Sequence, residues 1–251
     1  FFLLSKGRLK IFICLLASYF FYGWWDWRFL VLVLITTVSD YTIGLKLGTV
    51  TEQGKRKRLL LTSILINLTL LGVFKYYNFF VGSFAGILNT IGLSITPFTL
   101  NIILPLGISF YTFQTLSYSI DVFYGKQKAE KHLGYFALYV AYFPQLVAGP
   151  IERYSRLAPQ LKEKHRFKYE NLVNGLRLML YGFFIKMVIA DNLSPLVDGV
   201  YAEPSNFGSV DILIAVFFYS FQIYSDFYGY SIIAIGSALI MGVKIIDNFK
   251  T

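Results

Sequence analysis

Residues 11–45 read IFICLLASYFFYGWWDWRFLVLVLITTVSDYTIGL, and this stretch decides the class of fold. Two apolar runs, 11–25 and 29–45, meet at a short turn, WWDWR at 24–28. A helix needs about 20 apolar residues to cross the hydrocarbon core, and fewer where interfacial aromatic residues anchor its ends. The stretch therefore predicts two membrane-spanning helices that return the chain to its starting side.

Four further apolar runs are predicted spans, namely 59–76, 98–124, 172–190 and 210–242. The last run is long for one crossing and contains Gly229 and Gly236, so it predicts either one broken, tilted helix or a hairpin. The composition agrees, because 56% of the residues are hydrophobic and only 15% are charged, against about 25% charged in soluble domains. We expect an all-α fold, a polytopic transmembrane helix bundle in which residues 1–251 form a single membrane domain.

The formal net charge of +9 is concentrated in loops. Seventeen of the 23 lysines and arginines fall in four clusters between apolar runs. These are Lys6, Arg8 and Lys10; Lys46, Lys55, Arg56, Lys57 and Arg58; Lys126, Lys128 and Lys131; and Arg153, Arg156, Lys162, Lys164, Arg166 and Lys168. Cytoplasmic loops of membrane proteins carry such an excess, so membrane lipid is the expected partner and nucleic acid is not. Residues 77–97 and 191–209 contain no lysine or arginine and are predicted to lie outside, 77–97 along the interface.

Residues 133–150 pose a conflict, because a full crossing there would place the six-charge cluster on the outside. The stretch contains Pro144, Gly149 and Pro150, which interrupt helical hydrogen bonding. Broken backbone at membrane depth persists only inside protein or beside a wet cavity. We therefore predict a re-entrant segment that begins and ends at the cytoplasmic face, followed by a short amphipathic helix within 152–170.

Polar side chains within the apolar runs are the candidate site residues, because they usually face a bundle interior or cavity. They are Gln114, Gln145, Glu152, Lys186, Gln222, Asp226 and Tyr230. A polar substrate tunnel would use all of them. Interhelical hydrogen bonds for Gln114, and snorkelling or capping for Lys186 with Asp191, explain those residues without function. Asp121, close to Lys126, is expected to be an interfacial charge.

No catalytic or metal-binding residue is predicted in these 251 residues. Cys14 is the single cysteine, which excludes an internal disulfide framework and a thiolate metal cluster. His132 and His165 each follow a lysine in a basic loop, where a solvated role is expected. The sequence contains no phosphate-binding loop, no HExxH and no nucleophile elbow.

Several strings resemble the bacterial branch of the membrane-bound O-acyltransferase family, of the alginate O-acetyltransferase type. They are SYFFYGWW at 18–25, FKYYNFF at 74–80, LPLGISFYTFQTLSYSID at 104–121, FPQLVAGPIE at 143–152 with PQL at 159–161, KMVIADNL at 186–193, QIYSDFYGYSIIAIG at 222–236 and NF at 248–249. Where the family commonly reads DFSGYSD, this sequence has Tyr228 for the serine and Ile232 for the last acid. That departure could alter acceptor preference.

The resemblance implies a multi-pass enzyme of the bacterial inner membrane. It would transfer an acyl group, most simply acetyl, from a cytoplasmic donor such as acetyl-CoA, without a bound cofactor. The acceptor would be an extracytoplasmic polysaccharide or acyl-relay protein. The family's catalytic histidine, in a tryptophan-histidine context, would follow Thr251. Since the sequence also begins at Phe1 rather than Met, we expect the N-terminal half of a longer protein, truncated at both ends and inactive alone.

Two other classes remain open at this stage. Broken helices and midplane polar residues also build transporters and channels, although these predict an internal inverted repeat that the sequence does not show. A non-catalytic membrane scaffold would be favoured if the gene stopped near Thr251.

Overall fold

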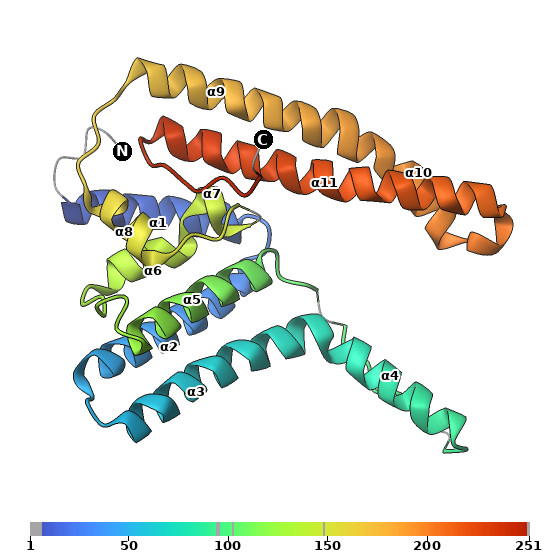
Figure 1. Cartoon of the computed structure of the whole chain (residues 1–251), viewed down its shortest axis with the longest axis horizontal. Coiled ribbons are helices and arrows are strands. Elements are labelled where there is room, and N and C mark those ends of the chain that lie inside the picture. Colours follow the sequence, from blue (N-terminus) through green and yellow to red (C-terminus); the bar gives the residue numbers. More distant parts are fainter. Residues whose placement is uncertain (1–6, 94–95, 102, 148, 250–251) are drawn as a thin grey trace. The chain divides into compact units, whose positions relative to one another are not determined.

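The computed structural model describes residues 7–93, 96–101, 103–147 and 149–249, and no strand occurs in these ranges (Figure 1). Lys6 and Thr251, named above, lie outside the described residues. The chain divides into two compact units. The N-terminal unit is Cys14–Val147 with Arg153–Ser155, and the C-terminal unit is the rest of the described chain. That both act as one membrane domain stays a prediction.

Within the described ranges, four helices are long and apolar enough to cross a membrane, by length and composition. They are Arg28–Thr49, Gln53–Thr90, Tyr169–Ala202 and Ser209–Ile240. A shorter apolar helix, Leu9–Gly23, belongs to α1 (Gly7–Gly23). The prediction of an all-α, polytopic helical membrane protein is confirmed.

In the N-terminal unit, α2 (Arg28–Thr49), α3 (Gln53–Leu71) and α5 (Ile108–Phe123) pack against one another. The predicted span 98–124 is wrong in its first third, since the helix begins only at Ile108. Pro105 lacks an amide hydrogen, and Gly107 adopts a left-handed conformation with φ of 72°. A Cβ atom at Gly107 would also collide with the Leu146 carbonyl oxygen, so the chain turns there.

Residues 77–97 are predicted to lie outside, along the interface, after the span 59–76. Residues 77–90 instead form helix α4 (Tyr77–Thr90), which continues the helical segment of that span. A π-helical turn, η1 (Gly72–Tyr76), joins α3 to α4. The bend at this turn is visible in Figure 1. A π turn inserts one residue into the helical hydrogen-bond ladder, which explains the change of direction.

The predicted break in 133–150 is present as two short helices, α6 (Leu133–Ala141) and α7 (Phe143–Leu146). Tyr142 between them leaves the helical conformation, with φ of −59° and ψ of 109°, and Pro144 follows in the first turn of α7, where its missing N–H is tolerated. All residues from Phe136 to Tyr142 are buried. Entry from the cytoplasmic face stays a prediction.

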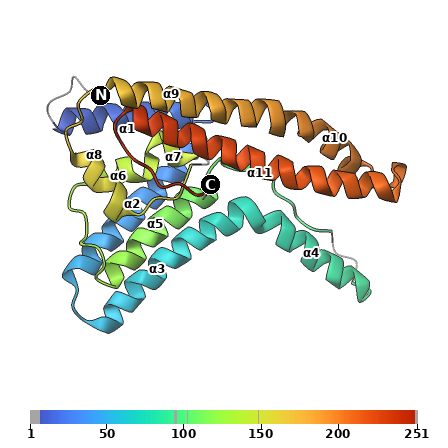
Figure 2. The ribbon, with the colours of Figure 1, turned by 45° about the horizontal axis from the view of Figure 1, so that its top comes forward.

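The C-terminal unit is dominated by two long helical segments that run side by side in Figures 1 and 2. The first comprises α9 (Tyr169–Phe184), the π-helical turn η2 (Ile185–Ala190) and α10 (Asp191–Ala202). The expected outside loop at 191–209 is therefore mostly helix. The second is α11 (Ser209–Ile240), which is unbroken, so the hairpin alternative for 210–242 is wrong.

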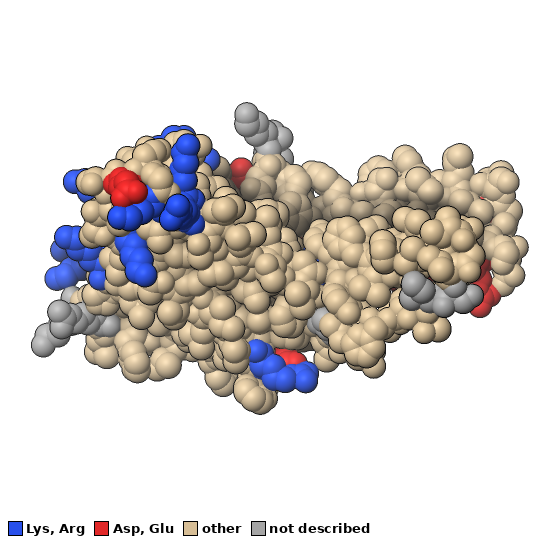
Figure 3. Space-filling model, turned by 90° about the horizontal axis from the view of Figure 1, so that it is seen from below, with Lys and Arg blue, Asp and Glu red and all other residues tan. Residues whose placement is uncertain are grey.

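The predicted amphipathic helix within 152–170 is confirmed as α8 (Tyr154–Lys162). Leu157 and Leu161 are buried, whereas Arg156 and Lys162 are exposed. On the face drawn in Figure 3, most lysine and arginine side chains gather in clusters.

Two charged residues, Arg56 in α3 and Asp121 in α5, make contacts that hold helices of the N-terminal unit together or cap their ends. Arg56 donates to the carbonyl oxygens of Leu47, Val50 and Phe123 at 2.5, 3.1 and 2.6 Å, so it caps the ends of α2 and α5. Asp121 is buried and pairs with Arg153 at 3.1 Å, and its expected position at the membrane interface stays a prediction.

Candidate functional site

An ion cluster forms where the π-helical turn η2 meets α11. Lys186 Nζ lies 2.8 Å from an Asp226 carboxylate oxygen and also hydrogen-bonds Asp191. The Nζ atom is 5.5 Å from the centroid of the Tyr230 ring, within cation–π range. We call Lys186, Asp191, Asp226 and Tyr230 the Lys186 cluster. Sequence analysis named all four residues but explained Lys186 and Asp191 by snorkelling or capping, and it did not predict the pair with Asp226.

Glycines bring the two helices of this cluster into close contact. An ideal Cβ atom on Gly182 would lie 2.7 Å from the Gly229 carbonyl oxygen, and one on Gly175 would lie 2.6 Å from that of Gly236. Real Cβ atoms do not approach backbone oxygen so closely, so these positions need glycine. The break expected from Gly229 and Gly236 does not occur because both serve packing.

The π turn and the glycine contacts together set the direction of the Lys186 side chain. Lys186 is the second residue of η2, and a Cβ on Gly229 would meet the Lys186 Cβ at 3.0 Å. This close approach places the Lys186 Cβ directly against the backbone of α11. The Lys186 side chain is only 21% exposed, whereas the Asp226 and Asp191 side chains are 43% and 49% exposed. The Lys186 ammonium is therefore mostly shielded from solvent, whereas the Asp226 and Asp191 carboxylates are partly exposed.

Gln222 precedes Asp226 by one helical turn and lies on the same face of α11. Its amide oxygen is buried and has no hydrogen-bond partner within the described ranges. Beside it, Phe249 packs its ring on Tyr224, Phe227 and Tyr228 at centroid distances of 5.5, 5.5 and 5.0 Å. The segment after α11 thus folds back along the helix, on the same stretch of α11.

The arrangement offers hydrogen-bond donors and acceptors rather than a reactive group. Carboxylate oxygens accept hydrogen bonds from hydroxyls, and the ammonium donates up to three. Among the described residues no group of three His, Cys, Asp or Glu could hold a metal ion. The Lys186 cluster can therefore bind and orient a hydroxylated molecule.

Gln114 and Gln145 are brought together in the N-terminal unit. Both amide nitrogens donate to the Tyr139 carbonyl oxygen, at 2.7 and 2.9 Å, and the Tyr139 hydroxyl donates to the Gln114 carbonyl oxygen at 3.1 Å. Each glutamine side chain is buried. They tie α5 to the two short helices, which favours the interhelical hydrogen-bonding role for Gln114.

Glu152 has a structural contact within the C-terminal unit. Its buried carboxylate accepts the backbone N–H of Ile246 and lies 3.7 Å from Arg156. Gln160 on α8 makes a second tie, since its side chain bonds the backbone N–H and carbonyl of Lys244 at 2.8 and 2.9 Å. The segment after α11 is thus held by α8. Whether the seven predicted residues line one tunnel stays a prediction.

The two histidines differ in environment. His132 is exposed, with its ring 5.1 Å from that of Tyr135. His165 is half-buried, and its Nε2 lies 2.7 Å from the Gln160 carbonyl oxygen, so this residue is not the solvated one expected. His165 belongs to the same unit as the Lys186 cluster, and within the described part of that unit it is not a hydrogen-bond or ion-pair partner of the cluster.

Sequence analysis missed Asp40, a fully buried carboxylate in α2. It accepts hydrogen bonds from Ser63 at 2.5 Å, Asn67 at 2.7 Å and Ser119 at 3.1 Å, and so links α2 to α3 and α5. The donors are neutral, which distinguishes this site from the Lys186 cluster. A lone acid inside an apolar run was the available signal, because such a residue needs a partner within the bundle.

Long apolar helices with a charged cluster between two of them define a polytopic helical membrane protein that carries a polar site between helices. The model of the membrane-bound O-acyltransferase family matches residues 12–250, and the chain belongs to that family.

Several curated relatives are similar to this chain, and two of the three described here match almost all of it. A "Probable alginate O-acetylase AlgI" from Pseudomonas syringae is 40% identical over 98% of this chain and 47% of its own length. A "Peptidoglycan O-acetyltransferase" from Helicobacter pylori is 33% identical over 94% of this chain and 49% of its length. A "Teichoic acid D-alanyltransferase" from Bacillus subtilis is 28% identical over 60% of this chain and 38% of its length. The chain spans about half the length of the first two of these relatives.

Proposed function

We propose that this chain is part of an O-acyltransferase of the bacterial inner membrane. It would move an acyl group, most simply acetyl, onto hydroxyls of an exported cell-envelope polysaccharide or onto an acyl-relay protein. The family match across residues 12–250 carries the proposal. The names of the relatives, which refer to alginate, peptidoglycan and teichoic acid, support an envelope acceptor.

The proposed reaction joins substrates from opposite sides of the membrane. The acyl donor, such as acetyl-CoA, would approach from the cytoplasmic side, where the basic clusters are predicted to lie. The acceptor would approach from outside. Holding the two in register removes much of the entropic barrier to their reaction, which is the task of a rigid helical frame.

We assign acceptor positioning to the Lys186 cluster. Open edges of the Asp226 and Asp191 carboxylates would accept hydrogen bonds from acceptor hydroxyls. Lys186, held by both carboxylates, would fix their orientation. We class them as positioning residues, because a general base must reach the acceptor oxygen within about 2.6 to 3.2 Å and His165, the histidine of the same unit, is not bonded to the cluster.

The catalytic base is therefore proposed to lie outside these 251 residues. The test uses protein expressed from its complete gene in membrane vesicles that also contain the polysaccharide. Radiolabelled acetyl-CoA should label the polysaccharide, and His132→Ala and His165→Ala should leave the rate unchanged. Transfer that either substitution abolishes would place the base in this chain, and absence of labelled polysaccharide or relay protein would overturn the proposed function.

A further inference from the structure

Lys75 is a cation inside a candidate membrane helix, Gln53–Thr90. Its exposed side chain contacts the Ser109 hydroxyl at 3.3 Å and lies 5.4 Å from the centroid of the Tyr76 ring. No carboxylate in the described part of the chain lies within ion-pair distance of it. Charged groups in membrane segments pair with opposite charge or reach headgroups, so this ammonium needs an anion.

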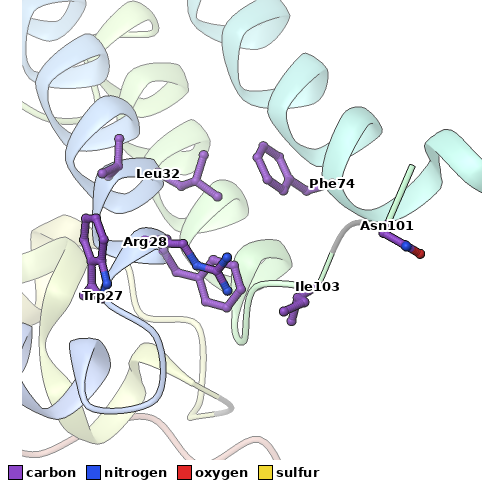
Figure 4. Close-up of a pocket in the computed structure, with 8 residues that line it drawn as sticks. Trp27, Arg28, Leu32, Phe74, Asn101 and Ile103 are labelled. Atoms are coloured by element: carbon purple, nitrogen blue, oxygen red, sulfur yellow. The ribbon is translucent and has the colours of Figure 1, made fainter. Parts of the chain in front are cut away.

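Two hollows meet beside Lys75, and Phe74 lines both of them. The larger, which we call the Phe74 crevice, has a volume of about 480 Å³, within the size range of ligand sites. Its apolar walls are Phe29, Val31, Leu32, Phe74 and Ile103. Figure 4 shows Leu32 and Phe74 facing each other across the opening. The smaller hollow, of about 140 Å³, is lined by Lys75 and Asn78.

The polar groups at these hollows differ in whether their charge and hydrogen bonds are already satisfied within the protein. Arg28 lines the Phe74 crevice, but its guanidinium is bound to the Asp26 carboxylate by hydrogen bonds of 2.9 and 3.0 Å, so that charge is balanced. Asn78 is also engaged, because its side chain bonds both the N–H and the carbonyl of Leu100, at 2.9 and 2.8 Å. That contact fixes the segment bearing Asn101, which lines the crevice. The walls are preformed, and Lys75 supplies the unbalanced charge.

We propose that this corner of the N-terminal unit binds one anionic phospholipid. The headgroup phosphate accepts hydrogen bonds from Lys75, and an acyl chain occupies the Phe74 crevice. An acidic saccharide fits less well, because its hydroxyls would lie unpaired against apolar walls. A free phosphate would satisfy Lys75 but leave the crevice unfilled.

The test measures lipid binding to the full chain in detergent by native mass spectrometry, with dioleoyl-phosphatidylglycerol as the probe. Lys75→Met should weaken binding by about fivefold, the effect expected of one basic residue near a lipid surface. Ile103→Trp, which fills the crevice from an exposed position, should also weaken it. Lys75→Arg should retain binding, because the positive charge and donors are kept.

Controls separate a specific site from general charge. Lys57→Met removes the same charge from an exposed position near the start of α3 and should leave binding unchanged. Each variant must keep the unfolding temperature of the parent in lipid-free detergent. Equal binding by Lys75→Met, equal binding of phosphatidylcholine, or displacement of the lipid by inorganic phosphate would each overturn the proposal.

Discussion

The two long helical segments that contain π turns, Gln53–Thr90 and Tyr169–Ala202, present the same device in different settings. Each turn carries a lysine, Lys75 in η1 and Lys186 in η2. π turns often occur at functional positions because they re-aim a side chain. Lys186 meets two carboxylates, whereas Lys75 meets a hydroxyl and an aromatic ring. The neighbouring helix therefore decides what the lysine does, since α11 contributes Asp226 and α5 contributes Ser109.

Removing the carboxylate partner should have the largest effect. In protein expressed from its complete gene, Asp226→Ala should lower acyl transfer about tenfold to hundredfold, the range expected from losing a hydrogen bond to a charged group. Membrane insertion should be unchanged, because α11 stays long and apolar. Labelled acetyl transfer to polysaccharide measures the effect.

Asp198→Ala is the matched control, since Asp198 is exposed on α10 and its carboxylate accepts a hydrogen bond from the Ser194 hydroxyl at 2.7 Å. It should transfer acetyl at the parental rate. Parental turnover in Asp226→Ala would reduce the Lys186 cluster to a structural ion pair and remove the functional contrast with Lys75.

Separating α9 from α11 should have the next largest effect. Gly182→Ala places a methyl group 2.7 Å from backbone oxygen and should destabilise the protein by about 1–3 kcal/mol, as overpacking does. Gly199→Ala in α10 meets nothing within 4 Å and should stabilise by about 0.5–1 kcal/mol, because alanine is the better helix former. Thermal unfolding in detergent compares them, and equal shifts of the same sign would contradict the close packing.

A smaller effect is expected from giving Lys75 the partner that Lys186 already has. Ser109→Asp should form an ion pair with Lys75 worth about 0.2–1 kcal/mol, because both groups are accessible. It should also weaken phosphatidylglycerol binding, since the phosphate then competes with a fixed carboxylate. Ser109→Asn, similar in size but neutral, is the control. Unchanged lipid binding in Ser109→Asp would remove Lys75 as the phosphate contact.

The last test concerns membrane topology, and its substitutions are expected to change neither activity nor stability. If both long helices begin at the cytoplasmic face, Lys57→Cys and Lys162→Cys in a Cys14→Ser background should resist an impermeant thiol reagent in intact cells. Ser205→Cys, in the segment predicted to lie outside, should react. Ready modification of Lys162→Cys would invalidate both the re-entrant segment and the shared orientation of the two helices.

The class of fold was predictable because membrane spans depend on local hydrophobicity, which 29–45 and 172–190 display directly. The ends of helices were less predictable. The apolar run at 98–124 hid the turn at Gly107, whose reason is a close approach to Leu146, distant in sequence. The continuation into α4 and α10 was missed because absence of positive charge marks a side of the membrane, not a loop.

For the site, the residues were predictable and their partners were not. Lys186 and Asp226 stood out as charges in apolar runs, yet they lie 40 residues apart, and only the glycine contacts of α9 with α11 bring them together. Gln145 and Gln114 looked similar in sequence, but both are used to hold a broken helix. Polarity alone does not distinguish a side chain that binds a ligand from one that hydrogen-bonds a backbone group of the protein.

The buried Asp40 has a consequence for how the protein enters the membrane during synthesis. Two of its donors follow 23 and 27 residues later on α3, and the third follows 79 residues later on α5. An unpaired aspartate at the centre of a membrane helix costs about 2.5–3.5 kcal/mol on insertion scales. Helix α2 is therefore best inserted as a hairpin with α3, so that Ser63 and Asn67 reach the carboxylate before either helix leaves the translocon for lipid. The nascent hairpin would still lack its third donor until α5 had been made.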